Sequence, residues 1–216
     1  MPRPMQAALL SGKELYHEVV LHRMTCARQS LWIATANVKE MFIQGPAGIF
    51  QSVLGMFERL AHRGVELRLL HAELPSRPFR AAFDRRPSLF RGGLQLKICP
   101  RVHFKAVLVD GAWCYLGSAN LTGAGLGARD AGRRNFELGF VTEDFDVIDR
   151  ATALFESVWS GVECRACKLY ARCPDPIGRR PAARGVRAPA DEGGIELGRP
   201  RRLRRPTSGV PSRRFP

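Results

Sequence analysis

The chain has 216 residues, of which 45% are hydrophobic and 25% are charged, as in an ordinary globular protein. Its 34 lysines and arginines outnumber its 20 acids and give a formal net charge of +14. Such an excess favours polyanionic partners, either nucleic acid or an anionic lipid surface. No run approaches the roughly eighteen consecutive apolar residues that a membrane-spanning helix needs.

The start of the chain lacks the long apolar core of a secretory signal, so we expect a cytoplasmic protein. In that compartment the six cysteines are expected to be free or metal-bound rather than paired in disulfides. The glycosylation pattern Asn120-Leu121-Thr122 is then expected to be unused.

Hydrophobic periodicity predicts alternating helices and strands in the first third of the chain. Residues 11–24 open with a capping-box pattern, Ser-x-x-Glu, and continue with apolar residues at helical spacing. Residues 30–36 predict a buried strand, and apolar positions from 49 to 60 predict a helix that ends at Gly64. Residues 65–71 predict the next strand. This strand–helix–strand order implies parallel pairing through a right-handed crossover.

The middle of the chain begins with a stretch that has little periodicity. Residues 72–93 are rich in proline and arginine, which predicts an irregular basic excursion. Alternating apolar residues predict a strand at 94–98. Residues 106–116 predict a β-hairpin that turns at Asp110-Gly111.

A strand predicted at 136–141 and a last helix predicted at 148–158 complete a first unit, residues 1–161. Its order of elements indicates an α/β layered fold, with a mixed β-sheet flanked by helices. Residues 162–176 are rich in cysteine, and we expect them to pack on this unit. Residues 177–216 form a third, basic part.

The composition changes abruptly in residues 177–216. This part has eleven arginines and three acids, with many prolines and glycines, and it supplies +8 of the net charge. It has too few large apolar residues to offset the entropy cost of ordering, which predicts a disordered tail. Two interpretations remain open, a solvated tail and a phosphate-binding arm.

The densest group of reactive side chains lies in residues 103–120, which read HFKAVLVDGAWCYLGSAN. Its distinctive positions are His103, Lys105, Asp110, Gly117, Ser118 and Asn120. The predicted hairpin returns Ser118 and Asn120 close to His103 and Lys105. A lysine ammonium, a hydroxyl and an amide then surround an imidazole. Such a donor-rich pocket suits a phosphate diester, which gains charge in the transition state.

These residues match the signature H-x-K-x4-D-x6-G-S-x-N, so the chain resembles a phospholipase D superfamily member with a single motif. The resemblance extends over approximately residues 9 to 161 and includes Asn135-Phe136-Glu137. It implies a phospholipase D-like fold and a phosphodiesterase that forms a phosphohistidine, with no cofactor for catalysis. Asp110 belongs to the signature, although its place in the turn favours a structural role.

The resemblance also implies a role for each matching residue. His103 would be the nucleophile of one subunit and the general acid and base of its mate. Lys105 and Asn120 would hold the non-bridging phosphate oxygens, with Ser118 assisting. Glu137 would accept the proton on the far imidazole nitrogen of His103 and fix its tautomer.

Two-step displacement at phosphorus needs a nucleophile and a separate acid, and in the family that the chain resembles the acid is a histidine from a second copy of the motif. Here the motif occurs once. The other histidines lack the H-x-K context. Single-motif relatives form a symmetric dimer, and a two-fold axis would bring two copies of the motif face to face. The resemblance therefore implies a homodimer.

A second group of side chains follows the last predicted helix. Cys164, Cys167 and Cys173 form the pattern C-x2-C-x5-C, whose first pair has the spacing of metal ligands. A closed site needs a fourth ligand, and Cys99 is our candidate because it ends a predicted strand. Structural zinc is the simpler interpretation. An iron–sulfur cluster and free thiols are the alternatives.

The motif predicts phosphodiester chemistry better than it predicts the substrate. Our main hypothesis is a metal-independent nuclease, because short single-motif relatives resemble endonucleases and the basic tail agrees. One alternative is a phospholipase D-type hydrolase or transphosphatidylase that acts on anionic or other phospholipids, although no amphipathic docking face is evident. Another is a non-catalytic nucleic-acid-binding module, which would need neither His103 nor Glu137.

Overall fold

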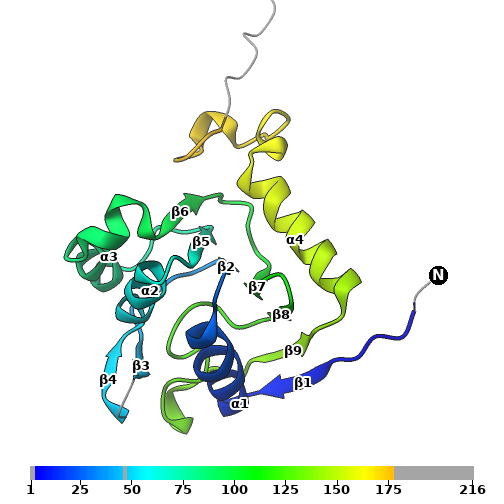
Figure 1. The fold of residues 1–216 in the computed structure, drawn as a ribbon. Coiled ribbons are helices and arrows are strands. Elements are labelled where there is room, and N and C mark those ends of the chain that lie inside the picture. The colour runs from blue at the N-terminus through cyan, green and yellow to red at the C-terminus, as the bar shows by residue number, and fades with distance from the viewer. Residues whose placement is uncertain (1–2, 46–47, 178–216) are drawn as a thin grey trace, which may run out of the picture. The chain divides into compact units, whose positions relative to one another are not determined.

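The computed structural model describes residues 3–45 and 48–177 (Figure 1). Its first elements are β1 (Ala8–Ser11), α1 (Lys13–Leu15), η1 (Tyr16–Arg23), η2 (Met24–Cys26), β2 (Ser30–Thr35), β3 (Phe42–Gln44), β4 (Phe50–Ser52), α2 (Val53–His62) and β5 (Glu66–His71). They are followed by α3 (Arg77–Asp84), η4 (Leu89–Gly93), β6 (Gln95–Ile98), β7 (Lys105–Val109), β8 (Trp113–Gly117), η5 (Ala131–Arg133), β9 (Leu138–Thr142), α4 (Phe145–Trp159), η6 (Val162–Cys164) and η7 (Tyr170–Arg172).

Seven strands form one mixed sheet in the order β1-β9-β8-β7-β2-β5-β6. The strands β2, β5 and β6 are parallel to one another. The other neighbours, from β1 to β2, are antiparallel. The predicted parallel pairing is confirmed, with Ser30 opposite Glu66 and Thr35 opposite His71. The predicted fold class, a mixed sheet flanked by helices, is confirmed as well.

Alternating residues of the strands divide the core into two clusters, one on each face of the sheet. On β2, Leu31 and Ile33 belong to the larger cluster, which also contains buried residues of η1, α2 and α3. Ala34 belongs to the smaller cluster, to which α4 contributes Ile148 and Phe155. Figure 1 shows α4 set apart from α2 and α3.

The predicted hairpin is confirmed, because β7 and β8 pair from Lys105 opposite Gly117 to Val109 opposite Trp113. The turn places Asp110 and Gly111 at φ values of +55° and +64°. Aspartate and glycine are among the residues that reach this left-handed region most readily. The turn chemistry of the motif therefore sets the register that brings its two halves together.

The helix predicted from residue 49 begins only at Val53, because residues 50–52 form strand β4. The Ser52 side chain accepts a hydrogen bond from the N–H of Leu54 at 3.1 Å and caps the helix. The N–H of Val53 donates to the carbonyl oxygen of Met41 at 2.9 Å. Phe50 pairs with β3 and is exposed, so its helical spacing from Val53 misled the prediction.

The prediction of an irregular excursion at 72–93 is wrong, since this stretch contains α3 and the helical turn η4. Ser76 caps α3 by accepting a hydrogen bond from the N–H of Phe79 at 3.4 Å. Phe79, Ala82 and Leu89 are buried in the larger cluster. The many arginines obscured this narrow apolar stripe in the sequence.

The strand predicted from residue 136 begins at Leu138, and Phe136 is fully exposed. The last helix is confirmed, and it starts where Asp144 accepts hydrogen bonds from the N–H groups of Asp146 and Val147. Of the predicted tail, all but Ile177 lies outside the described residues. Within the described part of the chain, no helix has the length and apolarity to cross a membrane.

Candidate active site

The two halves of the motif meet at one end of the β7–β8 hairpin. Lys105, the first residue of β7, lies opposite Gly117, the last residue of β8. His103 precedes Lys105 by two residues, and the Lys105 ammonium donates a hydrogen bond to the backbone oxygen of His103 at 2.7 Å. Ser118 follows β8 directly, and both His103 and Ser118 are exposed. The strand pairing thus brings the backbones of the two halves of the motif to the same end of the hairpin, and the approach of their side chains stays a prediction.

The glycine of the motif is required by close packing beneath the site. A Cβ at Gly117 would lie 2.3 Å from the Tyr115 hydroxyl and 2.7 Å from the Cα of Gly139. Tyr115 is buried, and its hydroxyl accepts a hydrogen bond from the N–H of Ala119 at 3.2 Å. Burial raises the pKa of Tyr115 to about 12, so the phenol stays neutral. Tyr115 thus supports the motif from below as a packing residue.

Asn120 is oriented by the segment that follows β2. Its Oδ1 accepts hydrogen bonds from the N–H groups of Ala36 and Asn37, both at 3.1 Å, and lies 3.1 Å from the Thr35 hydroxyl. Only the amide oxygen can accept from backbone N–H groups. The Nδ2 of Asn120 is therefore the end that can donate to a ligand, in agreement with its predicted phosphate-binding role.

Ser118 and Glu137 form a second contact across the site. The Ser118 hydroxyl donates to the Glu137 carboxylate and accepts a hydrogen bond from the N–H of Leu138 at 3.1 Å. Asn135 donates to the other Glu137 oxygen at 3.0 Å. The His103 imidazole forms no hydrogen bond or ion pair with residues 3–45 or 48–177. The Glu137–His103 pair therefore stays a prediction.

Asp110 lies at the opposite end of β7, so it does not join the residues around His103. Its carboxylate accepts hydrogen bonds from the consecutive N–H groups of Arg28, Gln29 and Ser30, at 2.7 to 3.1 Å. Partial burial raises the pKa of Asp110, but these bonds outweigh it and hold the pKa below its usual value. These contacts agree with the structural role that its place in the turn favours, rather than with direct participation in catalysis.

We expect Asp110→Asn to lower the free energy of unfolding by about 1 kcal/mol at neutral pH, because a charged, partly solvent-screened acceptor becomes neutral. Asparagine also adopts positive φ, so the turn adds no strain. The pKa of Asp110 is lower in the folded chain than in the unfolded chain, where it is about 3.9. The ionised carboxylate therefore stabilises the fold above about pH 3.9, and this stabilisation is lost as the pH falls through the pKa of the folded chain. Urea unfolding at several pH values measures this. If the difference in free energy of unfolding between wild type and Asp110→Asn stayed the same in acid, the carboxylate would not have this role.

The four predicted metal ligands come together in the structure. Cys99, Cys164, Cys167 and Cys173 all line one narrow pocket beside β6. Burial raises the pKa of the Cys99 thiol, and the nearby thiols of Cys173 and Cys164 add to this shift. However, no group of three or more Cys, His, Asp or Glu within the described residues is arranged to hold a metal ion. The zinc site therefore stays a prediction.

If these thiols bind zinc, the purified full chain should contain about one zinc per subunit. Elemental analysis after anaerobic purification measures the zinc, and an absorption spectrum detects an iron–sulfur cluster. Cys164→Ser should lower both the metal content and the unfolding temperature, whereas Cys26→Ser should change neither. Wild-type protein without zinc or iron would show that the four cysteines are free thiols.

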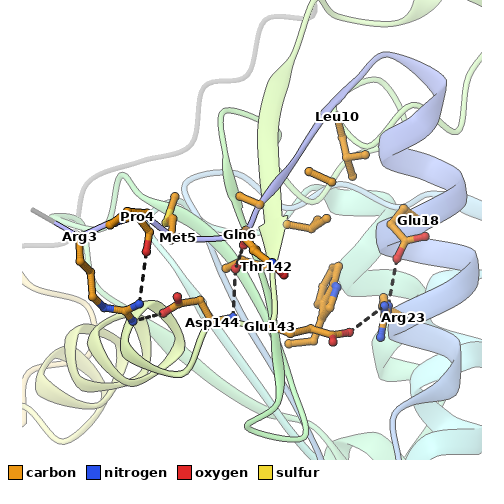
Figure 2. Close-up of a pocket in the computed structure, with 14 residues that line it drawn as sticks. Arg3, Pro4, Met5, Gln6, Leu10, Glu18, Arg23, Thr142, Glu143 and Asp144 are labelled. Carbon is orange, nitrogen blue, oxygen red and sulfur yellow. Dashed lines mark hydrogen bonds and ion pairs between the residues drawn. The ribbon is translucent and has the colours of Figure 1, made fainter.

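A separate pocket of about 780 Å³ contains none of the motif residues. As Figure 2 shows, it lies between the N-terminal segment and the junction of β9 with α4. Arg23 forms ion pairs there with Glu18 at 3.0 Å and Glu143 at 3.1 Å. His103, Lys105, Ser118 and Asn120 therefore lie outside this pocket.

Sequence reasoning missed two residues that shape the site. Thr35 accepts a hydrogen bond from the N–H of Leu121 at 3.0 Å and contacts Asn120, although it lies 85 residues earlier. Tyr115 was part of the predicted hairpin, but its hydroxyl contact with Ala119 was not foreseen. The alternation of β8 places Tyr115 and Gly117 on one face, and this is the only signal that could have indicated the contact.

Comparisons with known proteins agree with the fold and the motif. The family profile for the PLD-like domain of cardiolipin synthase matches residues 20–159. Nuc from Salmonella typhimurium, described as a phospholipase D family member, superposes with a TM-score of 0.52 at 17% identity, over 71% of this chain and 95% of that chain. NucT from Helicobacter pylori superposes with the same TM-score and coverage at 13% identity. No curated protein sequence matches the chain significantly. With a match over more than half of its residues, the chain belongs to the family of phospholipase D-like domains.

Proposed function

We propose that the chain is a phosphodiesterase that forms a phosphohistidine and acts on nucleic acid without a metal ion. The observation that supports this proposal is the pairing of Lys105 with Gly117, which brings the segments that carry His103, Ser118 and Asn120 to the same end of the β7–β8 hairpin. An imidazole beside an ammonium, a hydroxyl and an oriented amide can attack phosphorus and stabilise the charge that develops on its oxygens.

The reaction proceeds in two displacements. The neutral imidazole of His103 attacks phosphorus, a P–N bond forms, and the bond from phosphorus to the leaving oxygen breaks. The partner's His103 donates a proton to that oxygen. Water then attacks phosphorus and gives its proton to the partner's His103, while the P–N bond breaks. Lys105 and the Asn120 amide hold the non-bridging oxygens through both steps.

One chain supplies one imidazole of the required pair, so the proposed active unit is a homodimer. An apolar strip beside the site supports this. Leu9 and Leu138 lie on the same face of the sheet, and their side chains are 69% and 54% exposed. Phe136, two residues before Leu138, is exposed as well. Exposed apolar strips of this kind are typical of surfaces that bind another protein.

The charge of the chain favours nucleic acid over neutral lipid. The net charge of +14 attracts a polyphosphate backbone along its length, whereas a phospholipid presents a single phosphodiester. A non-catalytic nucleic-acid-binding module would need neither His103 nor the contact between Ser118 and Glu137. The net charge therefore favours the nuclease over the phospholipase, and the site's groups favour it over the binding-only module.

We expect cleavage of labelled DNA or RNA to continue in EDTA, because the two imidazoles supply both nucleophile and acid. Purified protein should be incubated in parallel with single- and double-stranded DNA, RNA and phosphatidylcholine. His103→Asn should reduce cleavage at least about a hundredfold while retaining affinity for polyanions. A strict requirement for added Mg²⁺, or near-wild-type cleavage by the variant, would refute the mechanism. Hydrolysis of phosphatidylcholine alone would favour the phospholipase alternative.

Mixing wild-type and His103→Asn subunits tests the dimer. Mixed dimers contain one imidazole and should be nearly inactive, so activity should fall with the square of the wild-type fraction. The subunits must be unfolded and refolded together so that they exchange, and Cys26→Ser serves as the matched, neutral partner. A linear fall in activity, or full activity from a demonstrated monomer, would show that each chain works alone.

A further inference from the structure

The β3–β4 ribbon displays two aromatic side chains on one face. Phe42 lies opposite Ser52 and Gln44 lies opposite Phe50, so all four side chains project from the same side of the ribbon. Phe42 and Phe50 are therefore diagonal neighbours, roughly 7–8 Å apart at their backbones, which aromatic rings can bridge. Both are largely exposed, Phe42 at 60% and Phe50 at 64%.

This ribbon is held firmly from its other face. Ile43 is buried in the larger core cluster, and the N–H of Gln44 donates to the hydroxyl of Tyr16 at 2.7 Å. The N–H of Val53, directly after the ribbon, donates to the Met41 carbonyl at 2.9 Å. Figure 1 shows β3 and β4 outside the seven-stranded sheet, next to the start of α2. The two rings are thus exposed on a ribbon whose other face is packed against the core.

The ribbon emerges from the active site. Asn37 donates its N–H to the motif residue Asn120, and the N–H of Lys39 donates to the carbonyl oxygen of Leu121 at 3.1 Å. Phe42 is five residues beyond Asn37, so their backbones lie at most about 18 Å apart. A chain-like substrate bound at the motif could therefore also reach the ribbon.

The charges around the ribbon suit a phosphate backbone. Residues 41–57 contain no charged side chain. Lys39 is exposed just before the ribbon. Arg59 binds the side chain of Gln51 in β4, which lies on the ribbon face opposite to Phe42 and Phe50. The nearest preceding acid, Glu40, has both carboxylate oxygens buried. An anion that approaches the two rings therefore meets no charged side chain within the ribbon itself, and the exposed charge that directly precedes the ribbon is the cation Lys39.

We propose that Phe42 and Phe50 form a stacking platform for unpaired nucleobases, which makes single-stranded nucleic acid the preferred substrate. This inference rests on the proposed nuclease function. Aromatic rings flanked by cations bind single strands, because every base offers a flat face for stacking. In a duplex the bases are already stacked on one another, so the rings have no exposed base face to bind.

Binding of labelled single- and double-stranded DNA of equal length tests the platform. The measurement uses the full chain with His103→Asn, so that cleavage does not interfere. Phe42→Ala and Phe50→Ala should each weaken single-strand affinity about five- to a hundredfold and leave duplex affinity within about twofold. The slope of affinity against salt should not change, since no phosphate contact is removed. Phe90→Ala, at another exposed phenylalanine, is the matched control and should have no effect.

Conservative substitutions separate stacking from simple apolar contact. Phe42→Tyr should retain single-strand binding, whereas Phe42→Leu should lose most of it. Equal losses for single strands and duplexes, or full binding by Phe42→Leu, would overturn the proposal. Dissociation of the dimer on Phe42→Ala would identify a second copy as the occupant. Loss of binding to phosphatidylglycerol vesicles, with DNA binding intact, would identify a membrane.

Hydrolysis of bis(p-nitrophenyl) phosphate distinguishes this inference from the proposed function. With His103 intact, Phe42→Ala and Phe50→Ala should hydrolyse this small diester at the wild-type rate, because a diester that occupies the motif alone need not contact the ribbon. If the wild-type chain hydrolyses no diester at all, the nuclease proposal fails, and the single-strand binding result still decides whether the platform exists.

Discussion

The site depends on the hydrogen bonds that the Asn120 side chain makes to the end of β2. Its amide oxygen accepts from the N–H groups of Ala36 and Asn37, which would otherwise lack partners as the chain leaves the sheet. The Thr35 hydroxyl closes the network by accepting from Leu121. Two segments far apart in sequence are thus tied together by groups that are costly to leave unsatisfied. This contact fixes both the direction of the Asn120 NH2 group and the point where the β3–β4 ribbon begins.

The two ends of the β7–β8 hairpin have different roles: the turn stabilises the fold, and the open end carries the residues that we propose for catalysis. At the turn, the Asp110 carboxylate accepts hydrogen bonds from three consecutive N–H groups and fixes the register of β7 against β8. At the open end, that register sets Lys105 against Gly117, and the packing of Gly117 and Gly139 on Tyr115 brings β9 close. Glu137 can meet Ser118 only because these glycines have no side chains. Strand geometry by itself therefore requires the spacing of the signature, apart from any role of these residues in catalysis.

The sequence predicts the parts of this structure that depend on local spacing. The apolar runs of β2 and β5 and the hairpin turn at Asp110 are recognisable because neighbouring residues determine them. The β3–β4 ribbon was missed because Phe50 lies three residues before Val53, as in a helix, and only pairing with β3 assigns it to a strand. The contacts of Glu137 with Ser118 and of Asn120 with Thr35 join residues 19 and 85 positions apart. No local pattern encodes such contacts.

The phosphodiester group is chemically the same whether it joins two nucleosides or a lipid and its head group. In our proposal His103, Lys105 and Asn120 contact only phosphorus and its oxygens, so they would not discriminate between these substrates by themselves. Discrimination requires side chains that meet the rest of the substrate, and these must lie beside the motif on a rigid support. The apolar strip of Leu9 and Leu138 serves the second subunit in our proposal. The aromatic face of the ribbon is then the surface that remains to distinguish a base from an acyl chain, since a flat ring stacks on the first and not on the second.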